Sequence, residues 1–153
     1  MEQNPIRNDA RMARRTRQVG PGAKCALCDE RDARALVARA GLCYECLAAK
    51  RGRPRTEKHH FPNEDNSLFT VMIPGNEHRI LNHQQLDWPR KTFRNPHGSP
   101  LLKASAAMRG WLDVLRLIID RVGWIPALLE DLDGWLEKRL GPEWWRHIPK
   151  RET

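Results

Sequence analysis

Residues 57–83 have the sequence EKHHFPNEDNSLFTVMIPGNEHRILNH. The apolar run at 68–73 is typical of a strand, and the turn-forming residues at 63–66 separate it from a first strand through His59 and His60. A short helix is expected at about 77–86. This stretch therefore predicts a ββα unit, in which a hairpin of two strands is followed by one helix.

Histidines are concentrated in this predicted unit. Four of the six histidines of the chain fall within these residues: His59, His60, His78 and His83. Imidazole changes its charge near neutral pH, so it can take a proton there or bind a metal ion. Asn82 follows His78 by one helical turn and shares its face. The cluster predicts a functional site built on the hairpin and the helix.

The order of these residues resembles the HNH nucleases, the ββα-metal family. The resemblance covers residues 57–83 and rests on the pair His59-His60, on Asn66, and on Asn76-x-His78-Arg79. It implies a metal-dependent endonuclease that hydrolyses phosphodiester bonds in DNA, with Mg²⁺, Mn²⁺ or Ni²⁺ as the catalytic ion. In such a site a base takes a proton from water while the metal stabilises charge on the phosphate.

The resemblance also implies a role for each residue. His60 is expected to be the general base, and Asn66 is expected to hold the loop that orients it. His59 and His78 are expected to bind the metal, with Asn82 or His83 completing the site. Many relatives frame the last motif with Cys-x-x-Cys, but Pro74 and Glu77 occupy those positions here. An external brace for the hairpin is therefore expected from the upstream cysteines.

Two Cys-x-x-Cys pairs precede the unit, separated by fourteen residues: Cys25, Cys28, Cys43 and Cys46. Each such turn points two thiolates at one ion, and four thiolates close a tetrahedron with no open position. The spacing predicts one structural Zn²⁺ in a small module at 23–50, although the spacing alone also admits an iron–sulfur cluster. Metal would supply much of the stability of so short a segment.

Basic residues are concentrated toward the start of the chain. The net charge is +8, and residues 1–60 hold 14 Lys and Arg against 7 Asp and Glu. Such a field favours an anionic partner over a merely solvated surface. Residues 1–22 are predicted to be a flexible basic arm. The linker at 51–58 resembles the AT-hook in its Arg-Gly-Arg-Pro core, although a plain basic linker is favoured. Phosphate contacts are assigned to Arg51, Arg53, Arg55 and Arg79.

The C-terminal region, residues 99–153, is predicted to be helical. Apolar residues recur there at steps that alternate between four and three, apart from the last, which is a heptad-like seam. Gly123 and Pro126 divide it into helices at about 100–122 and 125–140, kinked or folded as a hairpin. A core within the domain is favoured over pairing of two copies. The seam consists of Trp111, Leu115, Ile118, Val122, Ile125, Leu129, Leu132, Leu136 and Leu140.

The predicted architecture is α+β: a zinc knuckle module at 23–50, a basic linker with an HNH-like unit at 51–98, and a C-terminal helical hairpin. No apolar leader or membrane-spanning run is recognisable, so a cytoplasmic protein is expected. The expected partner is nucleic acid, with no membrane, and with a homodimer or a protein partner at the C-terminal helices. Two alternatives remain: a non-catalytic DNA-binding or regulatory protein, and an interaction module organised by zinc.

Overall fold

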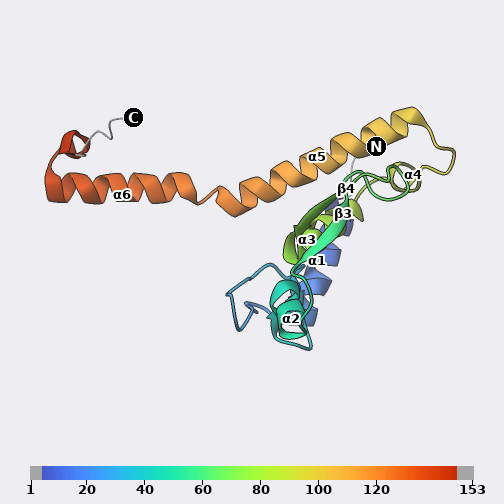
Figure 1. The fold of residues 1–153 in the computed structure, drawn as a ribbon, viewed down its shortest axis with the longest axis horizontal. Helices are drawn as coiled ribbons and strands as arrows, with labels where there is room; N and C mark the ends of the chain where they lie inside the picture. Colours follow the sequence, from blue (N-terminus) through green and yellow to red (C-terminus); the bar gives the residue numbers. More distant parts are fainter. Residues whose placement is uncertain (1–4, 148–153) are drawn as a thin grey trace. The chain divides into compact units, whose positions relative to one another are not determined.

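The computed structural model describes residues 5–147, with side chains from residue 9 to residue 146. Figure 1 shows the order of the elements. This part of the chain divides into two units, of which the first ends at Leu117 and the second begins at Ile118, inside helix α5 (Pro100–Val122). The predicted domain boundary near residue 99 therefore differs from this division, because most of α5 belongs with the first unit.

A ββα unit lies at the expected place. Strand β3 (Thr56–His60) pairs antiparallel with β4 (Thr70–Pro74), with His60 opposite Thr70. Helix α3 (Gly75–Gln85) follows directly. The second strand starts two residues later than predicted, and the helix two residues earlier. Gly75 permits the early start, since its N–H donates to the Arg55 carbonyl at 2.8 Å and a Cβ there would lie 3.1 Å from that oxygen.

The cysteine module occupies the predicted segment. It contains the short antiparallel strands β1 (Leu36–Val37) and β2 (Leu42–Cys43), followed by helix α2 (Tyr44–Lys50). Its core is small, because only Cys25, Leu36, Leu42 and Cys43 are buried together. Two of these four residues are candidate metal ligands. The module thus has little apolar core beyond its thiols.

Contacts between the cysteine module and the ββα unit supply the external brace that the sequence predicts. The Glu45 N–H donates to Asn76 Oδ1 at 3.2 Å, and the Asn76 N–H donates back to Glu45 Oε1 at 3.1 Å. Ala35 of the module is fully buried with Ile80 and Leu81 of α3. The start of α3, which carries His78, is therefore fixed against the module.

The N-terminal segment is a helix, so the prediction of a flexible arm is wrong for helix α1 (Pro5–Val19). Two of its arginines are tied to the rest of the first unit. Arg11 forms an ion pair with Asp87. Arg15 donates through Nε to the Ala33 carbonyl at 2.9 Å and also to the Leu36 carbonyl. These long-range contacts hold α1 against the first unit, whereas its arginines on their own would favour a segment surrounded by solvent.

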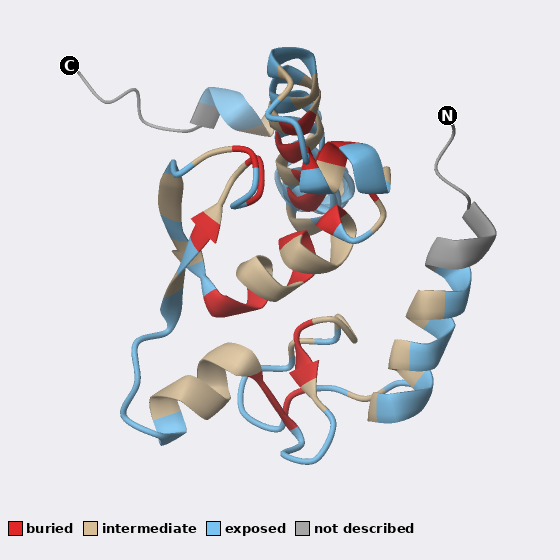
Figure 2. Cartoon of the chain, turned by 90° about the vertical axis from the view of Figure 1, so that its right-hand side faces the viewer, coloured by how far each residue is buried: buried red, intermediate tan, exposed pale blue. Residues whose placement is uncertain are grey.

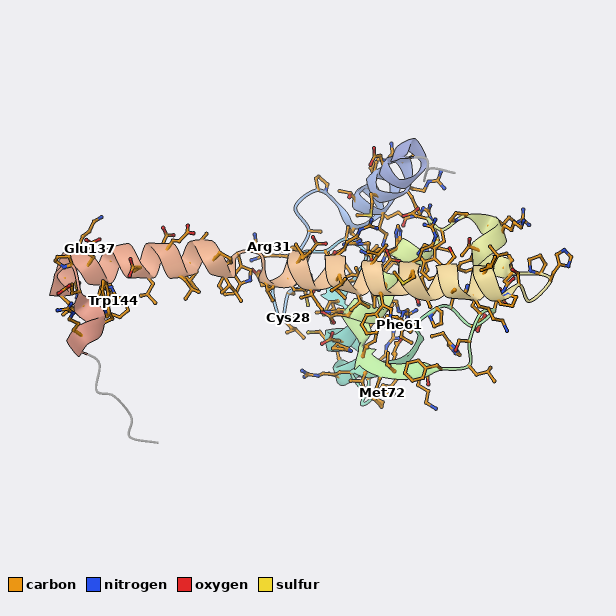
Figure 3. All side chains as sticks on the ribbon, turned by 90° about the horizontal axis from the view of Figure 1, so that it is seen from above. Cys28, Arg31, Phe61, Met72, Glu137 and Trp144 are labelled. Carbon is orange, nitrogen blue, oxygen red and sulfur yellow. The ribbon has the colours of Figure 1, made fainter. Side chains whose placement is uncertain are left out.

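Helix α5 packs against the first unit through the middle of its length, where Figure 2 shows buried residues in red and Figure 3 shows Phe61 beside the helix. Gly110 is buried there, and the Phe61 ring packs edge-on against Trp111 at 4.7 Å between centroids. Asp113 is also buried and accepts a hydrogen bond of 2.8 Å from Trp88 Nε1. Helix α4 (Arg90–Arg94) lies between α3 and α5 in the chain.

The second unit comprises the end of α5, helix α6 (Ile125–Leu140) and the 3₁₀ turn η1 (Trp144–His147). The predicted pair of helices is confirmed with its boundaries, whereas a hairpin stays a prediction. The seam does not form the predicted core, because α6 has no buried residue among those described and Leu129 is 57% exposed. One helix and a turn cannot enclose that stripe. No described helix is both long and apolar enough to cross a membrane.

Candidate functional site

The four cysteine thiols gather at one point. Their Sγ atoms all lie within 4.8 Å of one another, and Cys28 Sγ lies 3.5 Å from Cys43 Sγ. A tetrahedral Zn²⁺ with bonds of about 2.3 Å requires similar sulfur separations. The Cys46 N–H also points at Cys43 Sγ, at 3.4 Å, as in metal-binding turns. The donor set and its spacing therefore fit a zinc ion, in agreement with the sequence.

The thiols differ in their electrostatic surroundings. Burial raises the pKa of Cys25, but backbone N–H groups that include that of Cys43 outweigh it and bring the pKa to about 6. Burial and the neighbouring thiols raise the pKa of Cys46. Four thiolates so close together repel one another, and a divalent cation relieves that repulsion. The cluster is thus built for a metal more than for free thiols.

His59 is buried between β3 and α3. Its ring meets the His78 ring edge-on at 5.3 Å between centroids, and its Nε2 lies 3.4 Å from Gln85 Nε2. Its Nδ1 is buried without a hydrogen-bond partner among the described residues. Burial, and then the proximity of His78, lowers the pKa of His59 to about 4. The imidazole is therefore neutral at physiological pH, the form that can bind a metal.

His78 is held from both sides. Its Nδ1 is bonded to the Glu57 carboxylate, which also accepts from Arg79, and its Nε2 lies 3.1 Å from Asn82 Nδ2. A carboxylate on one imidazole nitrogen fixes the tautomer and presents the other nitrogen to a ligand. His59, His78 and Asn82, all predicted ligands, therefore meet at one place.

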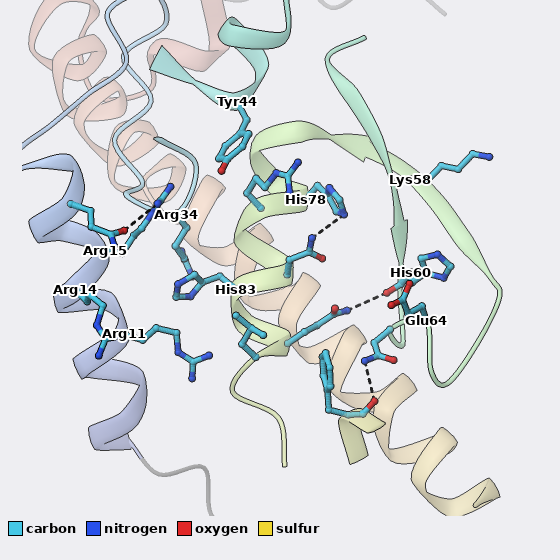
Figure 4. A pocket seen from close by; sticks show the side chains of 17 residues that line it. Arg11, Arg14, Arg15, Arg34, Tyr44, Lys58, His60, Glu64, His78 and His83 are labelled. Atoms are coloured by element: carbon cyan, nitrogen blue, oxygen red, sulfur yellow. Dashed lines mark hydrogen bonds between the residues drawn. The ribbon is translucent and has the colours of Figure 1, made fainter. Parts of the chain in front are cut away.

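His83 lies apart from this group. Residues five apart on a helix point about 140° away from each other, so His78 and His83 cannot both face His59 from α3. Burial, followed by Arg11 and Arg34, lowers the pKa of His83, which places it near the basic side chains of α1 and of the cysteine module. Figure 4 shows it on that side. Of the two candidates for the last ligand, Asn82 is the one beside His78.

His60 points to the other side of β3, as expected for adjacent strand residues. Its Nδ1 lies 3.2 Å from the Ser67 carbonyl oxygen. Since a carbonyl only accepts, this contact places the proton on Nδ1 and leaves the lone pair of Nε2 available. Ser67 belongs to the loop between β3 and β4. The loop therefore sets the orientation and the tautomer of His60.

Buried asparagines anchor that loop to the segment around α4. Asn66 donates to the Thr92 carbonyl at 3.0 Å and accepts from Asn95 Nδ2 at 3.1 Å. Asn63, with a left-handed φ of 74°, donates to the Phe93 carbonyl at 3.1 Å. Asn66, next to Ser67, thus ties the loop to residues 92–95, and holding this loop is the role that the resemblance implies for it.

A cavity of about 730 Å³ opens in front of this site (Figure 4). His60, His78 and Asn82 are among the residues that line it, whereas the buried His59 is not. Aromatic side chains of Tyr44 and Phe93 also line it. Six of its lining residues are basic and Glu64 is the single acidic one: Arg11, Arg14, Arg15, Arg34, Lys58 and Arg79.

The predicted phosphate-binding arginines divide into two groups. Arg79 lines the cavity, paired with Glu57 and stacked over the Tyr44 ring at 4.5 Å. Arg51, Arg53 and Arg55 are exposed on the linker and do not line it. In the described part of the chain, no contact places these three arginines beside the histidines.

Several residues of the site escape sequence reasoning. Glu57 and Gln85 touch the histidines, but single polar residues on a strand or helix carry no signal of their own. The Asn63 and Asn95 partners of Asn66 could have been suspected from their places in Asn- and Pro-rich turns. The arginines of α1 were missed as cavity residues because helix α1 was not predicted.

A comparison with protein-family models finds no match, and neither a curated protein nor a solved structure matches the chain.

Proposed function

We propose that the chain is a metal-dependent endonuclease that hydrolyses phosphodiester bonds in DNA, with an HNH-like site on β3, β4 and α3. The observation that carries the proposal is His60. Its Nδ1 is engaged by the Ser67 carbonyl, and His60 is among the residues that line a basic cavity together with His78 and Asn82. An oriented imidazole with a free nitrogen, at the edge of a space suited to anions, has the chemistry of a general base for phosphodiester hydrolysis.

In this proposal Nε2 of His60 takes the proton from the attacking water. Asn66 positions His60 indirectly, because it anchors the loop that supplies the Ser67 carbonyl. The basic residues of the cavity hold the phosphate and offset its charge. The edge-on contact of the Phe61 ring with Trp111 of α5 helps to hold the end of β3 in position.

A catalytic divalent cation would be held by His59 and His78, with Asn82 beside them. The buried, unpartnered Nδ1 of His59 and the carboxylate-fixed ring of His78 fit such a role. Bound there, the cation would stabilise negative charge on the phosphate. Imidazole donors favour Ni²⁺ in this set, since Mg²⁺ and Mn²⁺ prefer oxygen ligands.

A non-catalytic DNA-binding protein is the second candidate function, and one observation favours it. The two imidazoles face amides, with Gln85 on His59 and Asn82 on His78, and the Glu57 carboxylate is engaged on the Nδ1 side of His78. Among the described residues, the cysteines alone form a group of three or more His, Cys, Asp or Glu donors suited to a metal. Such a protein would bind DNA in a salt-dependent manner without cutting it.

The test uses supercoiled plasmid with Mg²⁺, Mn²⁺ or Ni²⁺, with and without a chelator of the added metal. Nicking by the wild type and its loss in His60→Ala are expected. His97→Ala is the matched control, because His97 is exposed outside the cavity. Nicking that survives in His60→Ala contradicts the assignment. A gel shift of DNA without any nicking selects the non-catalytic function.

The C-terminal helices suggest a protein partner, and we propose a second copy of this chain. The seam residues repeat at the spacing of a coiled coil, which a like helix matches. Leu115, Leu129 and Leu132 remain 50%, 57% and 46% exposed. Light scattering of wild type and Leu129→Asp should give a dimer and a monomer, whereas Glu130→Gln should remain dimeric. A monomeric wild type would point instead to an interaction module for another protein.

The cytoplasm, where thiols stay reduced, is the proposed location.

A further inference from the structure

The basic residues of the cavity are not equivalent in charge. Arg11, Arg34 and Arg79 each pair with a carboxylate, so their charge is largely offset; the partners are Asp87, Asp32 and Glu57. An offset guanidinium contributes little to binding an anion that must compete with its partner. These three residues therefore form part of the cavity wall but add little to its positive electrostatic potential.

Arg14 and Arg15 of α1 keep their charge. Arg15 is held by two backbone carbonyls and by Gln18, all of them neutral acceptors. Arg14 forms no hydrogen bond or ion pair with another described residue, and its side chain is exposed at the cavity. Arg14 and Arg15 thus bring two uncompensated guanidinium groups to the side of the cavity that α1 forms (Figure 4). Lys58 adds a third uncompensated cation from β3.

The opposite side of the same space carries His60 and His78. An anion on the α1 wall therefore lies in the same cavity as the histidines while contacting different residues. The guanidinium fork matches the two free oxygens of a phosphodiester, and a neighbouring Phe93 ring offers a face for a base. A cavity of about 730 Å³ is larger than one phosphate requires.

We propose that Arg14 and Arg15 form a phosphate-binding wall that holds the backbone of a nucleic-acid strand in this cavity. The inference deepens the proposed function and rests on it only in naming nucleic acid as the ligand. Arg15 is the fixed contact, because its carbonyl partners orient it before the strand binds. Arg14 is the adjustable one, because nothing holds its guanidinium in advance.

The test measures binding of a labelled single-stranded DNA oligonucleotide and of the same sequence as a duplex by fluorescence anisotropy. No divalent metal is added, and the background is His60→Ala, so that cleavage cannot interfere. Arg14→Gln removes a charge that makes no internal contact. Arg17→Gln is the matched control, since Arg17 is an exposed residue of the same helix that does not line the cavity.

Arg14→Gln should weaken binding and lower the slope of log Kd against log salt by about 0.7 for the single strand or about 0.9 for the duplex, the loss of one phosphate contact. Arg14→Lys should restore the slope, and Arg17→Gln should leave it unchanged. Equal effects of Arg14→Gln and Arg17→Gln would overturn the proposal, because a diffuse field and no defined wall would then explain the binding.

The outcomes separate this proposal from the proposed function. Binding that depends on Arg14, in a protein that nicks no plasmid, leaves the wall in place and removes the nuclease. Nicking that depends on His60, together with a salt slope that Arg14→Gln does not change, keeps the nuclease and refutes the wall.

Discussion

Gly110→Ala tests how closely α5 must approach the hairpin. A Cβ at Gly110 would lie 2.3 Å from the Phe61 carbonyl oxygen, where ordinary contact begins at 3.4 Å. Phe61 or the helix would have to move by about 1 Å, and overpacking of this kind costs about 1–3 kcal/mol. Alanine recovers up to about 1 kcal/mol of helix propensity. The expected net loss is roughly 1–2 kcal/mol, because the clash is with backbone and no rotamer change relieves it.

The effect should also reach the site, since Phe61 follows His60 directly. Thermal unfolding followed by far-UV circular dichroism should show a Tm lower by roughly 2–8 °C, and plasmid nicking should fall with it. Gly134→Ala is the matched control, because it lies inside α6 with nothing within 4 Å of the new Cβ. That variant should be more stable by about 0.5–1 kcal/mol. A Gly110→Ala protein as stable and as active as wild type would refute the reasoning.

Three further variants probe other parts of the first unit. Cys25→Ser should release bound zinc, because it removes one of the four ligands, whereas Ala26→Ser should retain the ion. Elemental analysis measures the zinc content, and a full content in both variants would exclude the four-thiol site. Asn66→Ala should lower the free energy of unfolding by about 1–3 kcal/mol, measured by denaturant, because it leaves buried carbonyls unpaired. Asp65→Ala, on the exposed part of the same loop, should leave this free energy unchanged. Equal losses in the two variants would show that Asn66 does not anchor the loop. Burial raises the pKa of Asp113, so the folded protein binds the carboxyl proton more tightly than the unfolded chain does. The free energy of unfolding therefore falls as the pH rises from the pKa of Asp113 in the unfolded chain to its pKa in the folded protein. Asp113→Asn removes that penalty and should improve stability relative to wild type more at neutral than at acidic pH; the reverse order would contradict the raised pKa.

Local patterns predicted the elements of the site well. The Cys-x-x-Cys pairs indicate a metal cluster because each pair forms its own turn, and the four thiols do converge. The strand–turn–strand–helix order of residues 57–83 is likewise encoded in short-range patterning, and the structure has it with shifts of about two residues. Gly75 explains the shifted helix start only through its contact with Arg55, which no local pattern reveals.

Contacts between distant segments could not be predicted in the same way. Arg11 and Asp87 are far apart in sequence, and their ion pair helps turn an expected flexible arm into a wall of the cavity. The partners of Asn66 come from residues 92–95, so its anchoring role followed only from a resemblance until those contacts were seen. The apolar seam predicted the two C-terminal helices but not their burial, because the period of apolar residues gives the face of a helix and not what covers that face.

Helix α3 contacts the core with one side and forms the site with the other, and this limits insertions and deletions within the helix. Ile80 is fully buried on one side of the helix, while His78 and Asn82 face the site on the other. A residue inserted between these positions would turn everything after it by about 100°, moving part of the histidine group toward the core. Natural variation in α3 should therefore consist of substitutions and exclude insertions or deletions. Leu68, 90% exposed before β4, marks a place where extra residues would be accommodated.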